Sequence, residues 1–146
     1  MGLFNGMNVS GSGMTAQRLR MDLISNNIAN INTTRTEDGG PYRKKSPVFK
    51  AKGGQKFSIP SLDSSNTSQT GQGVEVLNIK ESSKPPKLVY NPQHPDANEE
   101  GYVKMPNIDI ASEMVDMVSA SRAYEANVTA LNTSKQMFKS ALKIGK

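Results

Sequence analysis

The 146-residue sequence contains no cysteine, no tryptophan and one histidine, and only 5% of its residues are aromatic. The absence of cysteine excludes a disulfide framework and a thiolate metal site. No stretch approaches the roughly 20 consecutive apolar residues that a membrane-spanning helix needs. Residues 1–13 lack a charged region, an apolar run and a small-residue cleavage site. We therefore expect that any export from the cytoplasm removes no signal peptide.

Hydrophobic residues are also scarce, at 35% of the chain. Typical globular domains contain roughly 45–50% apolar residues when glycine is counted. Such a deficit indicates either partial disorder or a core that a partner completes. The apolar residues are concentrated in helical register at the two ends of the chain, which favours the second explanation. The formal net charge of +5 would by itself permit binding to a polyanion.

The C-terminal segment has the clearest pattern. From Ile110 to Leu142, mostly apolar residues recur alternately every four and three positions, as in a coiled coil. Pro106 and Asn107 are typical of a helix start, and we expect a helix from about Asp109 to Ile144, roughly 50 Å long. A second apolar line on the same segment predicts neighbours on two sides of this helix.

The N-terminal segment repeats an apolar residue every seven positions, at Met7, Met14, Met21 and Ile28. Gly11 and Gly13 each weaken a helix by about 1 kcal/mol. We therefore predict a firm helix only from about Met14 to Asn30, with an extension before it that depends on a partner.

Between the two ends, short strand patterns are separated by glycine, proline, serine and asparagine. They occupy residues 44–49, 55–59, 74–81, 88–90 and 102–105. The predicted fold class is α+β, with long N- and C-terminal helices that form a coiled-coil-like hairpin and a small β-rich module between them. The predicted divisions are residues 1–34, 35–106 and 107–146, with a mobile loop at about 52–72.

Few residues are candidates for chemistry. His94 stands between Pro92 and Pro95 without further ligand types at a suitable spacing, so we interpret it as part of a structural turn. Glu99 and Glu100 could form a glycosidase pair, but a solvated loop is the simpler interpretation. We predict no catalytic residue, no metal ligand and no cofactor.

A basic run extends from Arg43 to Lys56 with no acidic residue in it. It has few interleaved aromatic side chains, which single-stranded nucleic-acid binding would favour. Two interpretations stay open: a solvated strand face, or a contact with an acidic or polyanionic partner.

Two motifs resemble those of a known family. Residues 26–33 (NNIANINT) and residues 113–127 (EMVDM, then SRAYEAN) resemble the two terminal signatures of the flagellar rod and hook protein family. Residues 90–97, 100–107 and 39–43 are similar to segments of its proximal-rod branch. The resemblance covers nearly the whole chain.

This resemblance implies a structural subunit of the proximal rod of the bacterial flagellar basal body, required for motility. Terminal helices of such subunits pack into a tube that surrounds the export channel and transmits torque. The implied partners are other rod proteins, copies of the chain itself, and membrane-ring and export-apparatus proteins at the rod base. The implied location is the rod, across the periplasm or cell wall, after export through the flagellar type III apparatus without a cleaved signal. No nucleic acid, small-molecule substrate or membrane span is expected.

The residues that we predict to form subunit interfaces are apolar members of the two heptad patterns. They are Met14, Met21, Ile24, Ile28, Met114, Met117, Tyr124, Val128, Leu131, Phe138 and Leu142. The alternative hypothesis is a cytosolic coiled-coil binding module with a basic contact surface. That hypothesis explains the charge and the heptads but not the pair of terminal motifs.

Overall fold

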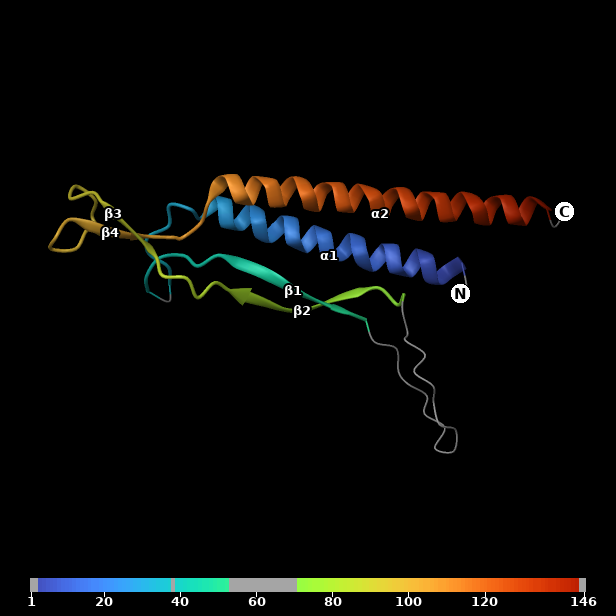
Figure 1. Ribbon diagram of the computed structural model, residues 1–146, viewed down its shortest axis with the longest axis horizontal. Coiled ribbons are helices and arrows are strands. Elements are labelled where there is room, and N and C mark those ends of the chain that lie inside the picture. The colour runs from blue at the N-terminus through green and yellow to red at the C-terminus, as the bar shows by residue number, and fades with distance from the viewer. Residues whose placement is uncertain (1–2, 38, 53–70, 145–146) are drawn as a thin grey trace, which may run out of the picture.

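The computed structural model describes residues 3–37, 39–52 and 71–144, which form two long helices and two small antiparallel sheets. Helix α1 comprises Leu3–Ala29 and helix α2 comprises Ile110–Ile144. The two helices lie side by side and run in opposite directions (Figure 1). The predicted α+β class, with a helical hairpin that encloses β structure in the sequence, is confirmed.

Each sheet has two strands. β1, Lys45–Ala51, pairs with β2, Val74–Glu81, and β3, Lys87–Tyr90, pairs with β4, Tyr102–Met105. The sequence pattern predicted all four of these strands, and the further strand predicted at residues 55–59 lies outside the described residues. Most of the loop predicted at about 52–72 lies outside them as well.

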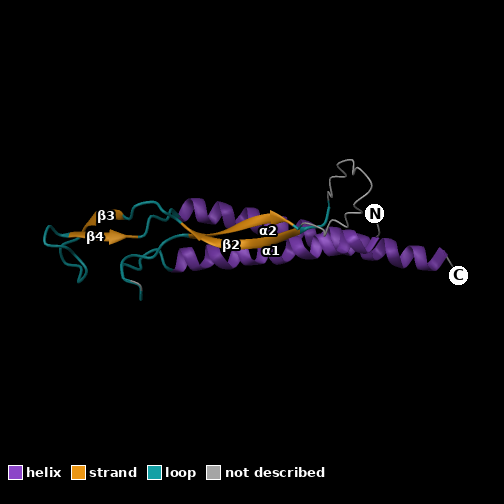
Figure 2. Ribbon diagram, turned by 90° about the horizontal axis from the view of Figure 1, so that it is seen from below, coloured by secondary structure: helices purple, strands orange, loops and turns teal. Residues whose placement is uncertain are grey.

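The elements form layers. Helix α1 contacts both α2 and the β1–β2 sheet, whereas α2 does not contact that sheet, so α1 is the middle layer (Figures 1 and 2). The β3–β4 ribbon projects beyond one end of the hairpin and contacts no other helix or strand of the described chain. The predicted β-rich module thus consists of two separate two-stranded sheets.

Helix α1 begins at Leu3 and so includes the extension before Met14 that the sequence predicted only with a partner. The reason is the packing of α1 against α2, which outweighs the low helix propensity of glycine. A Cβ atom on Gly13 would lie 2.8 Å from the Asn127 Oδ1 of α2, so glycine permits the close approach of the helices here. Gly11 has nothing within 4 Å of such an atom and serves no such purpose.

Helix α2 has nearly the predicted limits, but its N-terminal cap differs. The Asp109 Oδ2 accepts a hydrogen bond from the Ser112 N–H at 3.3 Å, which is the geometry of an N-cap. Asn107, which the sequence suggested as the cap, instead donates from Nδ2 to the Pro85 carbonyl oxygen at 3.0 Å. Asn107 therefore ties the start of α2 to the segment that precedes β3.

The hydrophobic core is small. Among the described residues, the buried apolar side chains are Ala16, Leu23, Ile24, Val103, Ile108 and Ala120. Two of these are alanines, one on each helix, and Val103 and Ile108 lie outside the helical hairpin. The scarcity of hydrophobic residues in the sequence is thus matched by a thin core.

Candidate subunit interface

A cluster of polar side chains joins α1, α2 and the start of β1. Asn27 on α1 is 1% exposed, and its Nδ2 donates to Glu113 Oε2 on α2 and to the Lys45 carbonyl oxygen, both at 3.0 Å. Its Oδ1 accepts from the Lys45 N–H at 2.9 Å and from the Tyr42 hydroxyl at 3.1 Å. These bonds use the full capacity of an amide side chain. We call this cluster, together with Lys44, the polar lock.

Glu113 is the charged member of the polar lock. It is 1% exposed and forms an ion pair with the Lys44 Nζ through its Oε1. A buried carboxylate without a partner would cost several kcal/mol, so the fold depends on supplying both Lys44 and Asn27 to it. Burial, aided by the negative charges of Glu81 and Glu113, raises the pKa of the Tyr42 hydroxyl, which therefore stays protonated and donates to Asn27.

A second ion pair crosses between the helices one or two turns away. Arg20 Nη2 on α1 lies 2.9 Å from Asp116 Oδ1 on α2, and both side chains are about one-third exposed. The helices are therefore joined at this end of the hairpin by directional polar contacts as well as by the buried side chains of Leu23 and Ile24.

The predicted seam of α2 faces α1 along the middle of the helix. Met117, Tyr124, Val128, Leu131 and Phe138 are half-buried there. On α1, Ile24 is buried, while Met14, Met21 and Ile28 are half-buried. Met21, Met117 and Tyr124 together line one shallow hollow of about 460 Å³ between the two helices.

Two of the predicted subunit-interface residues, at the two ends of the heptad pattern of α2, lie outside the contact between the two helices. Met114 is 59% exposed and Leu142 is 60% exposed, so neither lies between the helices of the hairpin. A straight helix drifts by roughly 20° per heptad relative to a seven-residue repeat, which turns Met114 away from α1. Leu142 is exposed because α2 extends past the N-terminal end of α1 (Figure 1). The edge-to-face pair of Phe4 and Phe138, with ring centroids 5.7 Å apart, lies near this end.

At the start of α2, the side of the helix that points away from α1 is apolar. Ile110, Met114, Val115 and Val118 are 47%, 59%, 70% and 52% exposed. The last three border an open hollow of about 440 Å³ that ends at Arg122. We call this set of four residues the outer face of α2.

Sequence reasoning missed the polar lock. Asn27 and Glu113 stood out in the sequence only as members of the two terminal motifs, residues 26–33 and 113–127. A signal was present, because Asn27 follows Ile24 by three residues and Leu23 by four, and so lies on the apolar stripe of α1. A polar residue on such a stripe needs partners when it is buried.

The residues considered for chemistry serve local structure. The His94 Nδ1 accepts from the Asp96 N–H at 3.1 Å, and Asp96 Oδ2 accepts from the Thr34 hydroxyl at 2.7 Å. In the described part of the chain, no group of three or more histidine, aspartate or glutamate residues is placed to hold a metal ion. No described helix is long and apolar enough to span a membrane.

The basic run is not one free surface. Lys44 is bound to Glu113, and the Lys45 Nζ lies 3.5 Å from Glu81 Oε1 and 6.0 Å from the centroid of the Tyr42 ring. Arg43 and Lys50 are exposed, and Lys56 lies outside the described residues.

Comparison with known proteins agrees with both terminal motifs. A family described as flagella basal body rod protein matches residues 7–35, which contain most of α1. A family described as flagellar basal body rod FlgEFG protein C-terminal matches residues 99–144, which contain β4 and α2. The fold and these matches define a protein of the flagellar rod class.

Relatives match over nearly their whole length. The flagellar basal-body rod protein FlgC of Borreliella burgdorferi is 50% identical, with 99% of this chain and 98% of that protein covered. FlgC of Bacillus subtilis is 48% identical over 98% of each chain, and FlgC of Escherichia coli is 42% identical over 99% of each. The chain therefore belongs to the FlgC family of flagellar basal-body rod proteins. It is a structural subunit of the rod, and the function that it serves is motility.

Proposed function

We propose that this chain polymerises with copies of itself and with related rod proteins through the outer faces of its terminal helices, and that the resulting tube is the proximal rod. The observation that carries this proposal is the outer face of α2, where Val115 is 70% exposed beside Met114 and Val118. A helix that already packs on one neighbour and still exposes an apolar stripe is suited to a second neighbour. Exposed apolar patches of this kind mark interaction sites.

The predicted interface residues have two roles in this proposal. Ile24, Ile28, Val128, Leu131 and Phe138 hold the hairpin together, and their burial leaves little surface for a neighbour. Met114, Leu142 and the open sides of Met14, Met21, Met117 and Tyr124 are available to other subunits. We add Val115, Val118 and Met137 to the interface, because each is more than half exposed.

The same proposal gives the subunit its place in the rod. The helices line the export channel, and the β structure lies outside them. Rod-base contacts are made with membrane-ring and export-apparatus proteins, and the rod crosses the periplasm or cell wall. The thin core suits passage through the type III export apparatus, because an unfolded chain is needed in transit and little apolar packing has to be undone.

We also propose that the subunit is purely mechanical, with no catalytic role, no cofactor and no small-molecule substrate. Many packed side chains along two long helices have to shear together when torque is applied. The polar lock contributes directional bonds to this resistance.

Val118→Glu tests the assembly face, since Val118 is 52% exposed and the change leaves the fold of the single chain intact. Leu77→Glu on β2 is the matched control, because Leu77 is 61% exposed and the charge change is the same. We expect that cells with Val118→Glu do not swim and that the variant protein is absent from purified basal bodies. The circular dichroism spectrum of the isolated variant should equal that of the unaltered chain. Normal rods with Val118→Glu, or equal loss in both variants, would contradict the proposed face.

A further inference from the structure

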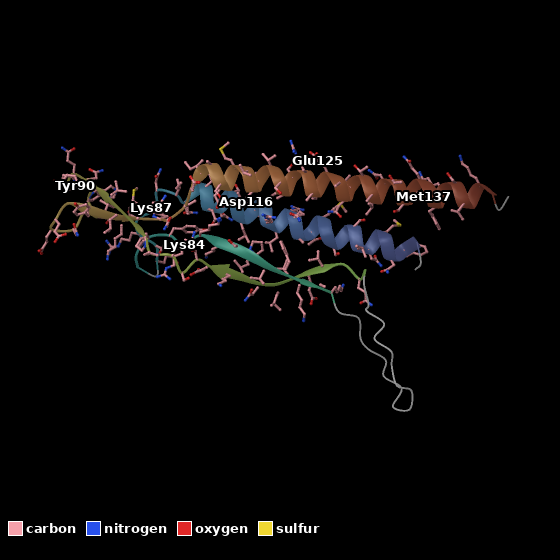
Figure 3. The ribbon with its side chains drawn as sticks, in the orientation of Figure 1. Lys84, Lys87, Tyr90, Asp116, Glu125 and Met137 are labelled. Atoms are coloured by element: carbon pink, nitrogen blue, oxygen red, sulfur yellow. The ribbon has the colours of Figure 1, made fainter. Side chains whose placement is uncertain are left out.

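A basic hollow lies where the β3–β4 ribbon leaves the rest of the molecule. Its volume is about 260 Å³, and its charged lining residues are Arg43, Lys44, Lys84 and Lys104, with no acidic residue among them. Lys84 and Lys87 lie together at this base, while Tyr90 lies further out along the ribbon (Figure 3). We call Arg43, Lys84 and Lys104, with the space between them, the basic hollow.

The cations of the basic hollow have no counterion among the described residues. In the part that the structure describes, Arg43, Lys84 and Lys104 form no ion pair, whereas the neighbouring Lys44 is bound to Glu113. All three side chains are exposed. Like charges around one concavity repel each other and focus a positive potential that attracts an anionic group.

The exposed acidic turn at the far end of the same ribbon has the complementary charge. Glu99 and Glu100 are exposed and form no ion pair with any described residue. The turn is firmly built, because the Asn98 Oδ1 accepts from the Tyr102 N–H at 2.7 Å. Gly101 has a φ of +80°, and a Cβ atom there would lie 2.9 Å from the Tyr90 ring. A rigid turn loses little conformational entropy when it binds.

One face of the β3–β4 ribbon is also left uncovered by the rest of the described chain. Leu88, Tyr90 and Tyr102 share one of its faces and are 61%, 65% and 40% exposed. The opposite face of the ribbon is covered at Val103, which is 2% exposed, so this face is the one that is open to a neighbour. A neighbouring molecule that covers this face would stabilise it.

We infer that the basic hollow of one subunit receives the Glu99–Glu100 turn of a second copy of the same chain. The inference rests on the proposed function, which places copies next to one another in the rod. Because each copy carries one hollow and one turn at opposite ends of one ribbon, the contact is head to tail. Head-to-tail contacts between identical subunits propagate along a helical array rather than closing as a two-fold dimer.

Charge reversal tests the pairing in the bacterium that makes the chain. Lys84→Glu with Lys104→Glu should reduce swimming and the number of assembled rods, and so should Glu99→Lys with Glu100→Lys. All four changes together keep the net charge of +5 and should restore both. Lys50→Glu with Lys80→Glu is the matched control, since both lysines are exposed on the β1–β2 sheet and should tolerate reversal.

Failure of the combined variant to recover, when each double variant is impaired, would show that the hollow binds something other than a second copy. An impaired control would show that net charge alone matters. Either outcome, or normal swimming in all variants, overturns the inference.

Cross-linking gives a direct readout, because the chain has no native cysteine. Lys84→Cys and Glu100→Cys in one chain should yield disulfide-linked dimers and longer ladders in purified basal bodies after mild oxidation. Each single variant and the pair Lys50→Cys with Glu100→Cys should not form ladders. Rods that assemble without the ladder overturn this inference alone, whereas absence of the unaltered chain from basal bodies would overturn the proposed function.

Discussion

In the first turns of α2, the two faces differ in the reverse of the usual way. The face toward α1 buries Glu113 and Ala120 and holds Asp116 in an ion pair, whereas the opposite face exposes Met114 and Val115. A helix on the surface of a globular protein ordinarily buries its larger apolar residues and exposes its charges. The start of α2 thus contributes small and polar groups to the hairpin and leaves its larger apolar side chains exposed to neighbours.

The difference separates two tasks. Hydrogen bonds to Asn27 and Glu113 are directional, so they fix the register of α1, α2 and β1 relative to one another. Apolar burial is non-directional and roughly proportional to area, so it suits the free energy of assembly. The single chain can therefore have a defined shape without a large core.

The strongest test compares an inner and an outer apolar residue. Leu23 is 7% exposed, and Leu23→Ala should lower the free energy of unfolding of the isolated chain by about 2–5 kcal/mol through a cavity. Val118→Ala should change it by less than about 0.5 kcal/mol, since Val118 is 52% exposed. Urea unfolding of both variants measures this contrast, and similar losses would mean that the two faces contribute alike.

The polar lock should contribute nearly as much to the free energy of unfolding as the Leu23 side chain does. Asn27→Ala leaves the Lys45 N–H and Glu113 Oε2 without this partner, and we expect a loss of about 3 kcal/mol. Asn26→Ala is the control at the next position, where the side chain is exposed, and it should cost under about 0.5 kcal/mol. Equal melting temperatures for the two variants would show that the lock is not stabilising.

A smaller effect is expected from the closest approach of the two helices. Gly13→Ala should destabilise the chain by about 1 kcal/mol, because the added methyl group forces the Asn127 side chain to move. Gly11→Ala meets nothing within 4 Å and should stabilise it by about 0.5–1 kcal/mol. A lower melting temperature for Gly13→Ala and a higher one for Gly11→Ala would support this packing. Higher melting temperatures for both variants would contradict it.

The smallest effect concerns pH. The pKa of Tyr42 is raised in the folded chain by burial and by Glu81 and Glu113. Its contribution to stability is therefore complete below the unfolded tyrosine pKa of about 10 and is lost as pH rises through the higher folded value. Tyr42→Phe should flatten the decline of stability in this alkaline range. Absorbance titration of tyrosinate, compared between the two proteins, would show whether Tyr42 is the last tyrosine to ionise.

The sequence predicted the elements better than their contacts. The apolar repeat located α2 almost to the residue, and the alternation of Val74, Val76 and their neighbours located β2, since both patterns are local. The segment of α1 before Met14 was predicted only as a partner-dependent extension, because Gly13 disfavours a helix until the close approach of Asn127 is known. The outer position of Met114 depends on how a straight helix rotates against its neighbour, which a heptad count does not contain.

The polar lock and the basic hollow were beyond local patterns for a different reason. Asn27 and Glu113 are 86 residues apart in the sequence. Arg43 and Lys104 line the same hollow only because the start of β1 lies near the base of the β3–β4 ribbon. The apolar stripe of α1 indicates that Asn27 needs partners, but no local pattern identifies those partners. The terminal motifs did indicate the family, because each is a short, contiguous sequence and the two lie toward opposite ends of the chain.

The uneven placement of the bonds between α1 and α2 has a mechanical consequence. In the described chain, the side-chain hydrogen bonds between the helices join Arg20 to Asp116 and Asn27 to Glu113, all toward one end of the hairpin. Toward the other end, the contacts include the edge-to-face pair of Phe4 and Phe138. The two helices are therefore held more rigidly at the end with the polar bonds than at the end with the aromatic pair. Under a twisting load, we expect the elastic compliance of each subunit to increase along its own axis, from the polar end to the aromatic end.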